Sequence, residues 1–194
     1  MPIVPGPSHH AGVVIPIRGF TAGKARLAEV LNDHERIELA TMMANAVADA
    51  AGPLPVTVVS SAPEVRSWAE ARGLALIDDP DAGLDAAVSV GRDALLARGY
   101  VQVIVAHADL PRARPGALVP FGTVQPDIVT IVPSHRDDGT PVLALSAEVA
   151  FTFSYGIGSA RRHAATARRM GLAVRVIRDP ELGYDIDLPE DLES

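Results

Sequence analysis

The chain alternates between short apolar runs and longer stretches in which apolar residues return every three or four positions. Residues 13–17 are Val-Val-Ile-Pro-Ile, a continuous apolar run that is typical of a strand buried on both faces. Residues 33–51 show helical spacing, with apolar positions at Ile37, Ala40, Ala44, Val47 and Ala51. Asp33 is the predicted N-cap of this helix, and Gly52-Pro53 is its stop signal.

The same two patterns alternate along the rest of the chain. They predict further strands at 55–60, 74–77, 101–106, 128–132, 142–145 and 174–177. They predict further helices at 63–72, 84–97 and 159–170. Strands that alternate with helices form a mostly parallel sheet with helices on both faces. The predicted fold is therefore a single-domain α/β protein whose ligands collect at the carboxyl ends of the strands.

The start of the chain follows neither pattern. Its first eleven residues, MPIVPGPSHHA, contain three prolines and two adjacent histidines. We predict that residues 1–12 are a flexible leader and that residues 13–194 form the domain. His9 and His10 are expected to be solvated rather than to bind a metal. The segment lacks the features of a secretory signal, and no apolar run approaches the roughly 18 residues that cross a bilayer. We expect a cytoplasmic protein with no membrane partner.

Composition narrows the classes of partner. The chain has 194 residues, 48% of them apolar but only 4% aromatic, which suits one domain with a core of small aliphatic side chains. Its net charge of −7 argues against a nucleic-acid partner, because phosphate backbones require a field of Lys and Arg. With no cysteine there is no disulfide and no thiol nucleophile. The alanine-rich helices permit a homodimer.

A basic loop follows the first predicted strand. Arg18, Lys24 and Arg26 lie within nine residues, and Gly19 and Gly23 allow the backbone to approach a ligand closely. This combination suits a triphosphate. The loop differs from a Walker A motif because it is one residue short and has Ala where Ser or Thr should follow the lysine. The alternative for this segment alone is a solvated basic turn.

Three carboxylates are candidate metal ligands. Asp109 follows the strand at 101–106, so it should lie at the carboxyl end of that strand. Asp185 and Asp187 are two residues apart, which in an extended chain places both on the same face. Carboxylates beside a triphosphate are the ligands that Mg²⁺ requires. The alternatives are a turn residue for Asp109 and an N-cap for Asp187.

Two further loops are candidate sites for an acidic acceptor. Tyr155-Gly156-Ile157-Gly158-Ser159 opens the last predicted helix, whose free N–H groups can bind an anion. Thr140, in the loop before the strand at 142–145, offers a hydroxyl. The alternative is that both loops are simple turns. His163 is expected to lie on the surface rather than to bind a ligand.

Taken in order, these segments resemble a known family. They are Ile15-Pro16-Ile17, Gly23-Lys24-Ala25-Arg26-Leu27, Gly83-Leu84-Asp85-Ala86-Ala87, Ala108-Asp109-Leu110-Pro111, Asp138-Gly139-Thr140, Gly156-Ile157-Gly158-Ser159 with His163, and the segment from Asp185 to Leu192. The set resembles the phospholactate and phosphoenolpyruvate guanylyltransferases that make the linker of the deazaflavin coenzyme F-420. The resemblance extends over nearly the whole chain.

The resemblance implies a Rossmann-like nucleotidyltransferase fold, a three-layer α/β/α sandwich. It implies that GTP and Mg²⁺ are used and that phosphoenolpyruvate or 2-phospho-L-lactate is the acceptor. By position, it assigns the metal to Asp109, Asp185 and Asp187, and catalysis to Lys24 and Asp109. It assigns nucleotide binding to Arg18, Gly23, Lys24, Arg26, Gly83 and Asp85. It assigns acceptor binding to Thr140, Gly156 and Ser159. Family members usually have Asn at position 85 and a small or amide residue at position 141, where this chain has Asp and Pro.

Two other functions stay open at this point. One is a nucleotidyltransferase of the same fold that acts on another acceptor, such as a molybdopterin. The other is a nucleotide-binding module without turnover, for which Asp85 and Pro141 would be signs of decay. Release of pyrophosphate with a panel of acceptors distinguishes all three.

Overall fold

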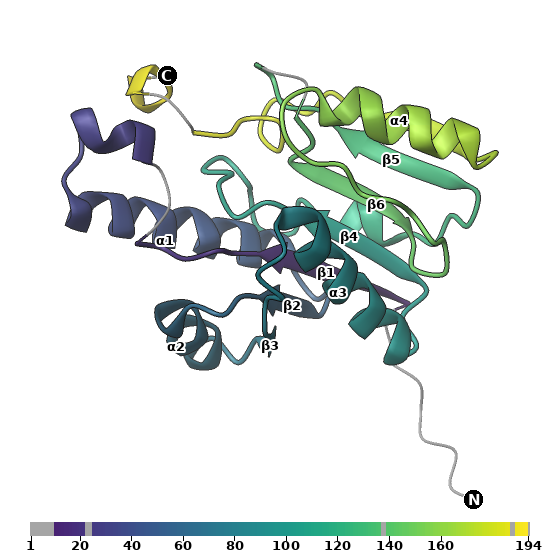
Figure 1. Ribbon diagram of the computed structural model, residues 1–194, viewed down its shortest axis with the longest axis horizontal. Helices are drawn as coiled ribbons and strands as arrows, with labels where there is room; N and C mark the ends of the chain where they lie inside the picture. The colour runs from purple at the N-terminus through teal and green to yellow at the C-terminus, as the bar shows by residue number, and fades with distance from the viewer. Residues whose placement is uncertain (1–9, 22–24, 137–138, 187–188, 194) are drawn as a thin grey trace, which may run out of the picture.

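The computed structural model describes residues 10–21, 25–136, 139–186 and 189–193. One seven-stranded sheet crosses the molecule in the order β3-β2-β1-β4-β6-β5-β7 (Figure 1). Its strands are β1 (Ala11–Pro16), β2 (Val56–Val59), β3 (Ala75–Ile77), β4 (Gln102–Ala106), β5 (Ile128–Val132), β6 (Val142–Ser146) and β7 (Ala173–Val176). Among the strands that the structure describes, only β6 runs antiparallel to its neighbours, which confirms the predicted mostly parallel sheet.

Within the described ranges, four α-helices cover the two faces of this sheet. They are α1 (Asp33–Ala50), α2 (Pro63–Ala71), α3 (Leu84–Ala97) and α4 (Ser159–Arg169). Three short 3₁₀ helices are η1 (Ala25–Glu29), η2 (Val119–Gly122) and η3 (Pro189–Glu193). One core cluster joins α1 and α2 to one face of the sheet, and a second joins α3 and α4 to the opposite face. The result is the three-layer α/β/α sandwich (Figure 1).

The alternation of side chains along the central strands explains the two clusters. Val13 and Ile15 of β1 pack in the cluster with α1, whereas Val14 packs in the cluster with α3. Helix α3 lies especially close to β1. A Cβ added to Gly91 would come within 2.5 Å of Val14 Cγ1, so only glycine fits this contact. None of the helices in the described part of the chain has the length and apolarity that a membrane crossing requires.

Two predicted boundaries are corrected by the structure. Strand β1 begins at Ala11, two residues before the prediction, because Ala11 and Gly12 pair with Gln102 and Val103 of β4. The rest of the predicted leader, residues 1–9 and with them His9, lies outside the described residues. His10 is described and is exposed.

The other correction concerns the N-cap of α1, which is Asn32 and not Asp33. Asn32 Oδ1 accepts the N–H of Glu35 at 3.0 Å, and a carboxylate oxygen of Glu35 accepts the N–H of Asn32 at 2.8 Å. These two reciprocal bonds form a capping box. Asp33 is instead the first helical residue, and it pairs with Arg36 at 2.5 Å.

Candidate active site

A cavity of about 520 Å³ opens where β1, β3 and β4 end. It is formed by the loop after β1, the start of α3, one face of α1 and the loop after β4. The residues that line it are Pro16, Ile17, Arg18, Gly19, Phe20, Ala40, Met43, Asp79, Asp81, Gly83, Leu84, Ala87, His107, Ala108 and Asp109. The cavity thus lies at the carboxyl ends of the strands, where ligands are expected to collect in a sheet of this kind.

The loop after β1 is anchored to α2. Phe20 is 4% exposed and packs edge-on against Trp68, with ring centroids 5.7 Å apart. Thr21 Oγ1 donates to Glu64 Oε1 at 3.2 Å. The hydrogen bond from its own backbone amide lowers the pKa of Glu64, and the bond from Thr21 acts in the same direction. These contacts hold Arg18 and Gly19 along the wall of the cavity.

The residues predicted to bind the triphosphate lie partly outside the described residues. Gly23 and Lys24 lie outside the described residues, and the side chain of Arg26 is likewise not described. Arg18 is exposed and lines the cavity. Gly83 lines it too and is the N-cap of α3, where its φ of 91° favours glycine.

Asp85, another residue predicted to bind the nucleotide, does not line the cavity as Gly83 does. Gly83, Leu84 and Ala87 line the cavity, but Asp85 is not among the lining residues. Its Oδ1 accepts the backbone N–H of Tyr155 at 2.7 Å. The first turn of α3 therefore faces the cavity on one side and contacts the loop before α4 on the other.

Sequence reasoning missed three polar residues of the cavity. Asp79 and Asp81 follow β3, and His107 follows β4 two residues before Asp109. The acidic run Asp78-Asp79-Pro80-Asp81 directly after a strand is a signal that could have revealed the first two. His107 Nε2 and Tyr155 Oη are buried, and neither has a hydrogen-bond partner within the described ranges. A buried polar atom of this kind marks a place where a ligand or water can bind.

Asp109 and Asp185 lie at the same edge of the sheet. Asp109 follows β4, and Asp185 accepts a hydrogen bond from Ser134 Oγ, just after β5, at 2.9 Å. The strand between them, β6, begins here, since Val142 pairs with both Ala106 and Val132. The parallel strands β4 and β5 thus bring these two acids to opposite sides of the start of β6.

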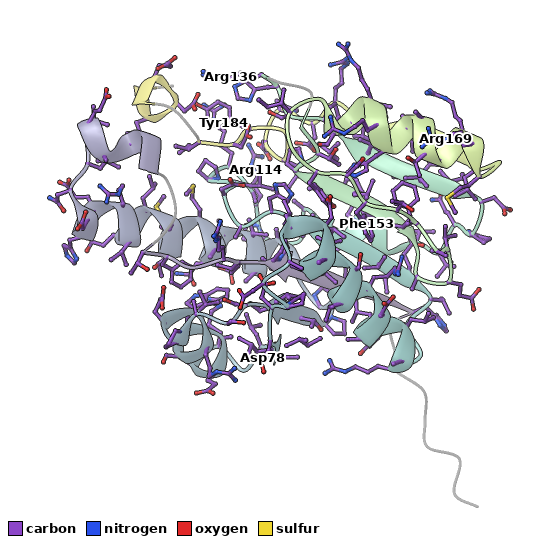
Figure 2. All side chains as sticks on the ribbon, in the orientation of Figure 1. Asp78, Arg114, Arg136, Phe153, Arg169 and Tyr184 are labelled. Atoms are coloured by element: carbon purple, nitrogen blue, oxygen red, sulfur yellow. The ribbon has the colours of Figure 1, made fainter. Side chains whose placement is uncertain are left out.

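The segments that carry these acids also pack together. The guanidinium of Arg112 stacks over the Tyr184 ring, with Cζ 3.7 Å from the centroid, and Arg114 pairs with Glu181. Figure 2 shows Arg114 and Tyr184 in this part of the molecule. His135 lies beside Asp185, with 3.6 Å between His135 Nδ1 and Asp185 Oδ1. Contacts between the two segments therefore hold Asp109 and Asp185 in one region.

The donor set in this region fits a hard cation. Asp109 and Asp185 supply carboxylate oxygens, which Mg²⁺ prefers over nitrogen or sulfur. Asp187, the third predicted ligand, lies outside the described residues. Within the described residues, no group of three or more His, Asp or Glu side chains is placed to hold an ion. The third ligand would have to come from the substrates or from Asp187.

The two predicted acceptor hydroxyls are in contact with each other. Thr140 Oγ1 lies 2.8 Å from Ser159 Oγ and 3.0 Å from His163 Nδ1. Thr140 is 2% exposed, while Ser159 and His163 are fully buried. The prediction that His163 lies on the surface is wrong, because its face of α4 packs against β5 and the Phe151-Phe153 segment. Gly156, with φ of 98°, is exposed on the loop before α4.

The hydrogen bonds of His163 determine its tautomer. The N–H of Ser154 donates to His163 Nε2 at 3.0 Å, so that nitrogen carries a lone pair. Burial lowers the pKa of His163 to about 4, and the ring is neutral at pH 7. A neutral ring with an unprotonated Nε2 has its proton on Nδ1, which donates to Thr140 Oγ1. Thr140 Oγ1 shares a further hydrogen bond with Ser159 Oγ, in which either hydroxyl can donate.

Comparison with known proteins agrees with this geometry. Residues 11–194 match the family described as "Guanylyl transferase CofC like". The chain is 34% identical to a phosphoenolpyruvate guanylyltransferase of Sphaerobacter thermophilus, over 93% of this chain and 90% of the relative. It is 35% identical to a 3-phospho-D-glycerate guanylyltransferase of Phenylobacterium zucineum, over 93% and 87%.

The fold also resembles solved structures. A nucleotidyl transferase from Methanothermobacter thermautotrophicus superposes with a TM-score of 0.68 at 19% identity, over 94% of both chains. At this identity the likeness concerns the fold alone. It supports the nucleotidyltransferase type of α/β/α sandwich.

Proposed function

Because the chain belongs to the CofC-like guanylyl transferase family, we propose that it transfers GMP from GTP to a small phosphorylated acid and releases pyrophosphate. The observation that carries the proposal is the cavity at the carboxyl ends of β1, β3 and β4, which is lined by both Arg18 and Asp109. A triphosphate binds beside a cationic side chain and a carboxylate that can hold Mg²⁺. Arg18 and Asp109 are side chains of these two kinds.

Phosphoenolpyruvate is the acceptor we favour, in a pathway to deazaflavin coenzyme F-420. Several relatives at 34–36% identity carry the name phosphoenolpyruvate guanylyltransferase. The relative named for 3-phospho-D-glycerate is as similar, at 35%. Both acids, like 2-phospho-L-lactate, combine a phosphate with a carboxylate on three carbons. We therefore propose this class of acceptor, with phosphoenolpyruvate as its first member to test.

The reaction requires little covalent chemistry from the protein. A phosphate oxygen of the acceptor attacks the α-phosphorus of GTP in line, a new P–O bond forms, and the bond to the bridging oxygen of the β-phosphate breaks. Pyrophosphate leaves with that oxygen. The nucleophile is already ionised, so no general base is needed. Positioning and charge stabilisation supply the catalysis.

Arg18, Lys24 and Arg26 would neutralise the triphosphate, and Gly23 and Gly83 would let the backbone approach it. Asp109, Asp185 and Asp187 would hold Mg²⁺, which would offset the repulsion between the two anionic substrates and the charge on the leaving pyrophosphate. Ser134 donates to Asp185 Oδ1 and so orients one of these carboxylates.

Two carboxylates of the cavity can account for the choice of guanine. Asp79 and Asp81 follow β3, three strands away from the β4 end that carries Asp109 in the order β3-β2-β1-β4. If the triphosphate lies between Arg18 and Asp109, the base would occupy the remaining part of the cavity, which Asp79 and Asp81 line. The guanine edge offers an N1–H and a 2-amino group, and a carboxylate accepts such a pair of donors. Adenine lacks this pair.

The residues predicted to bind the acceptor lie around the start of α4. Gly156 and Ser159 belong to this helix start, and Thr140 contacts Ser159. We propose that the backbone amides of this helix start bind the acceptor, because they carry the positive end of the helix dipole. The hydroxyls of Thr140 and Ser159 are buried, so their main contribution would be to hold the backbone in place.

The direct test is release of pyrophosphate from purified protein with GTP and Mg²⁺. The acceptor panel contains phosphoenolpyruvate, 2-phospho-L-lactate, 3-phospho-D-glycerate and molybdopterin, with ATP in parallel reactions as the control nucleotide. We expect turnover with GTP and at least one of the three phosphorylated acids. Turnover with molybdopterin alone would show a different acceptor class, and nucleotide binding without any turnover would show a binding module.

A further inference from the structure

The loop at residues 154–158, between the β6 side of the sheet and α4, is held from one side by Arg162. Its guanidinium makes four hydrogen bonds to three backbone carbonyls. Arg162 Nη1 donates to Ile157 O at 2.7 Å, and Nη2 donates to Ser154 O at 3.0 Å and to Tyr155 O at 2.8 Å. The carbonyl groups of the loop therefore point toward α4.

The direction of the carbonyls sets the direction of the amides. In a trans peptide the C=O of one residue and the N–H of the next point in opposite directions. With the carbonyls of Ser154, Tyr155 and Ile157 directed at Arg162, the N–H groups of Tyr155, Gly156 and Gly158 point away from it. The Tyr155 amide confirms this, because its N–H donates to Asp85 Oδ1 at 2.7 Å.

Asp85 therefore joins two parts of the site that are 70 residues apart in the sequence. It lies in the first turn of α3, whose Gly83, Leu84 and Ala87 line the nucleotide cavity. A carboxylate that accepts a backbone N–H makes a charge-assisted bond, which is stronger than a bond between neutral groups. The same carboxylate affects the Tyr155 phenol: burial raises the pKa of Tyr155 well above its ordinary value, and the charge of Asp85 adds to the effect.

We propose that Asp85 is a positioning residue for the acceptor and not a ligand of the nucleotide. It links the helix that borders the nucleotide cavity to the loop at residues 154–158, and it fixes the loop in the conformation that presents its amides to the acceptor anion. This inference rests on the proposed function. It also explains why either Asp or Asn can stand at position 85, because both side chains have an oxygen that can accept the Tyr155 N–H.

The proposal predicts that loss of Asp85 weakens binding of the acceptor and leaves binding of the nucleotide unchanged. Asp85→Ala removes the acceptor of the Tyr155 N–H, so the acceptor KM should rise about tenfold, as expected for one lost charge-assisted contact. The dissociation constant of a non-hydrolysable GTP analogue, measured with Mg²⁺ and without acceptor, should stay within about twofold. Asp85→Asn keeps a side-chain oxygen and should restore the acceptor KM. Glu70→Ala, an exposed acid on α2 at the opposite face of the sheet, is the control.

A second measurement needs no catalysis. Hydrogen exchange of peptides that cover residues 151–158 should be faster in Asp85→Ala than in the wild type, and unchanged in Asp85→Asn and Glu70→Ala. Faster exchange in a protein that shows no turnover with any acceptor would support the link and refute the proposed function. Unchanged exchange in Asp85→Ala would overturn the proposal, and so would a loss of affinity for the GTP analogue with the acceptor KM unaltered.

Discussion

Thr140, Ser159 and His163 form a continuous hydrogen-bonded chain in the interior of the protein. His163 is the member of this chain that can change its charge. Burial disfavours the protonated ring and lowers the pKa of His163 to about 4. Protonation of the ring would also remove the lone pair that accepts the Ser154 N–H. The loop before α4 and the helix start thus depend on a neutral His163.

This dependence predicts how stability changes with pH. The pKa of an unfolded histidine is about 6.5, so below that pH the unfolded state binds a proton that the folded state does not. The contribution of His163 is fully present above pH 6.5 and falls as the pH drops toward 4. When the pH is lowered from 7.5 to 5, the loss of this contribution should lower the free energy of unfolding by about 2 kcal/mol. Urea titrations across this range measure the slope.

The control for this experiment is His34, which is exposed on α1. His163→Gln should be less stable than the wild type at pH 7.5 and should show a shallower dependence on pH, whereas His34→Gln should keep the wild-type slope. An identical slope in His163→Gln and the wild type would show that this histidine is not the titrating group.

The carboxylates of Asp109 and Asp185 should behave as a single unit. If both hold the same Mg²⁺, loss of either removes the ion, so Asp109→Asn and Asp185→Asn should each abolish most turnover. The double variant should be little worse than either single variant. Steady-state rates at saturating Mg²⁺ provide the measurement, with the exposed Asp127→Asn as a matched control. Wild-type rates in either single variant would contradict the metal assignment.

At the scale of elements, α1 illustrates how a helix end is determined. Asn32 and Glu35 satisfy each other's backbone amides at the start of the helix. Asp33, one position later, is highly exposed, and its pair with Arg36 lies at the surface. A surface ion pair adds little stability compared with an N-cap.

Two alanine variants separate these contributions. Asn32→Ala should lower the free energy of unfolding by about 1 kcal/mol, because it leaves a backbone amide of the first turn without its acceptor. Asp33→Ala should cost less than about 0.5 kcal/mol. Chemical denaturation of both variants in the same buffer measures the difference. A larger loss for Asp33→Ala would mean that the helix begins with Asp33 as its cap.

At the scale of the whole molecule, the site is assembled from segments that are distant in sequence. The cavity draws on residues from Pro16 to Asp109, and the acceptor side adds residues 140–159. A ligand that bridges such segments should stabilise the entire fold, since it binds only the folded state.

GTP with Mg²⁺ should therefore raise the melting temperature of the protein. At a free concentration 100 times its dissociation constant, the nucleotide adds about 2.7 kcal/mol to the free energy of unfolding. Removal of Mg²⁺ with EDTA should abolish most of this gain, because the triphosphate would face Asp109 without a cation between them. Differential scanning fluorimetry with GTP, ATP and EDTA tests this. An equal shift with ATP would argue against guanine recognition by Asp79 and Asp81.

The sequence by itself determined the order and type of the strands and α-helices. Apolar runs and helical spacing are local properties, so they located α3 and β5 to the residue and most other elements to within one or two positions. The position of Asp109 is also a local property, because it follows from the strand that precedes this residue. Even the resemblance to the guanylyltransferases depended on the order of short segments.

The tertiary structure decided how the side chains of those segments are directed and what they contact. His163 is buried because the face of α4 that carries it packs on the sheet, and the helical pattern does not show which surface that face meets. Asp85 contacts Tyr155 only because the sheet brings α3 and the loop before α4 together. Asp79 and Asp81 enter the cavity through the position of β3 beside β2. Contacts of this kind join residues far apart in the chain, so they depend on the packing of the whole fold and not on local spacing.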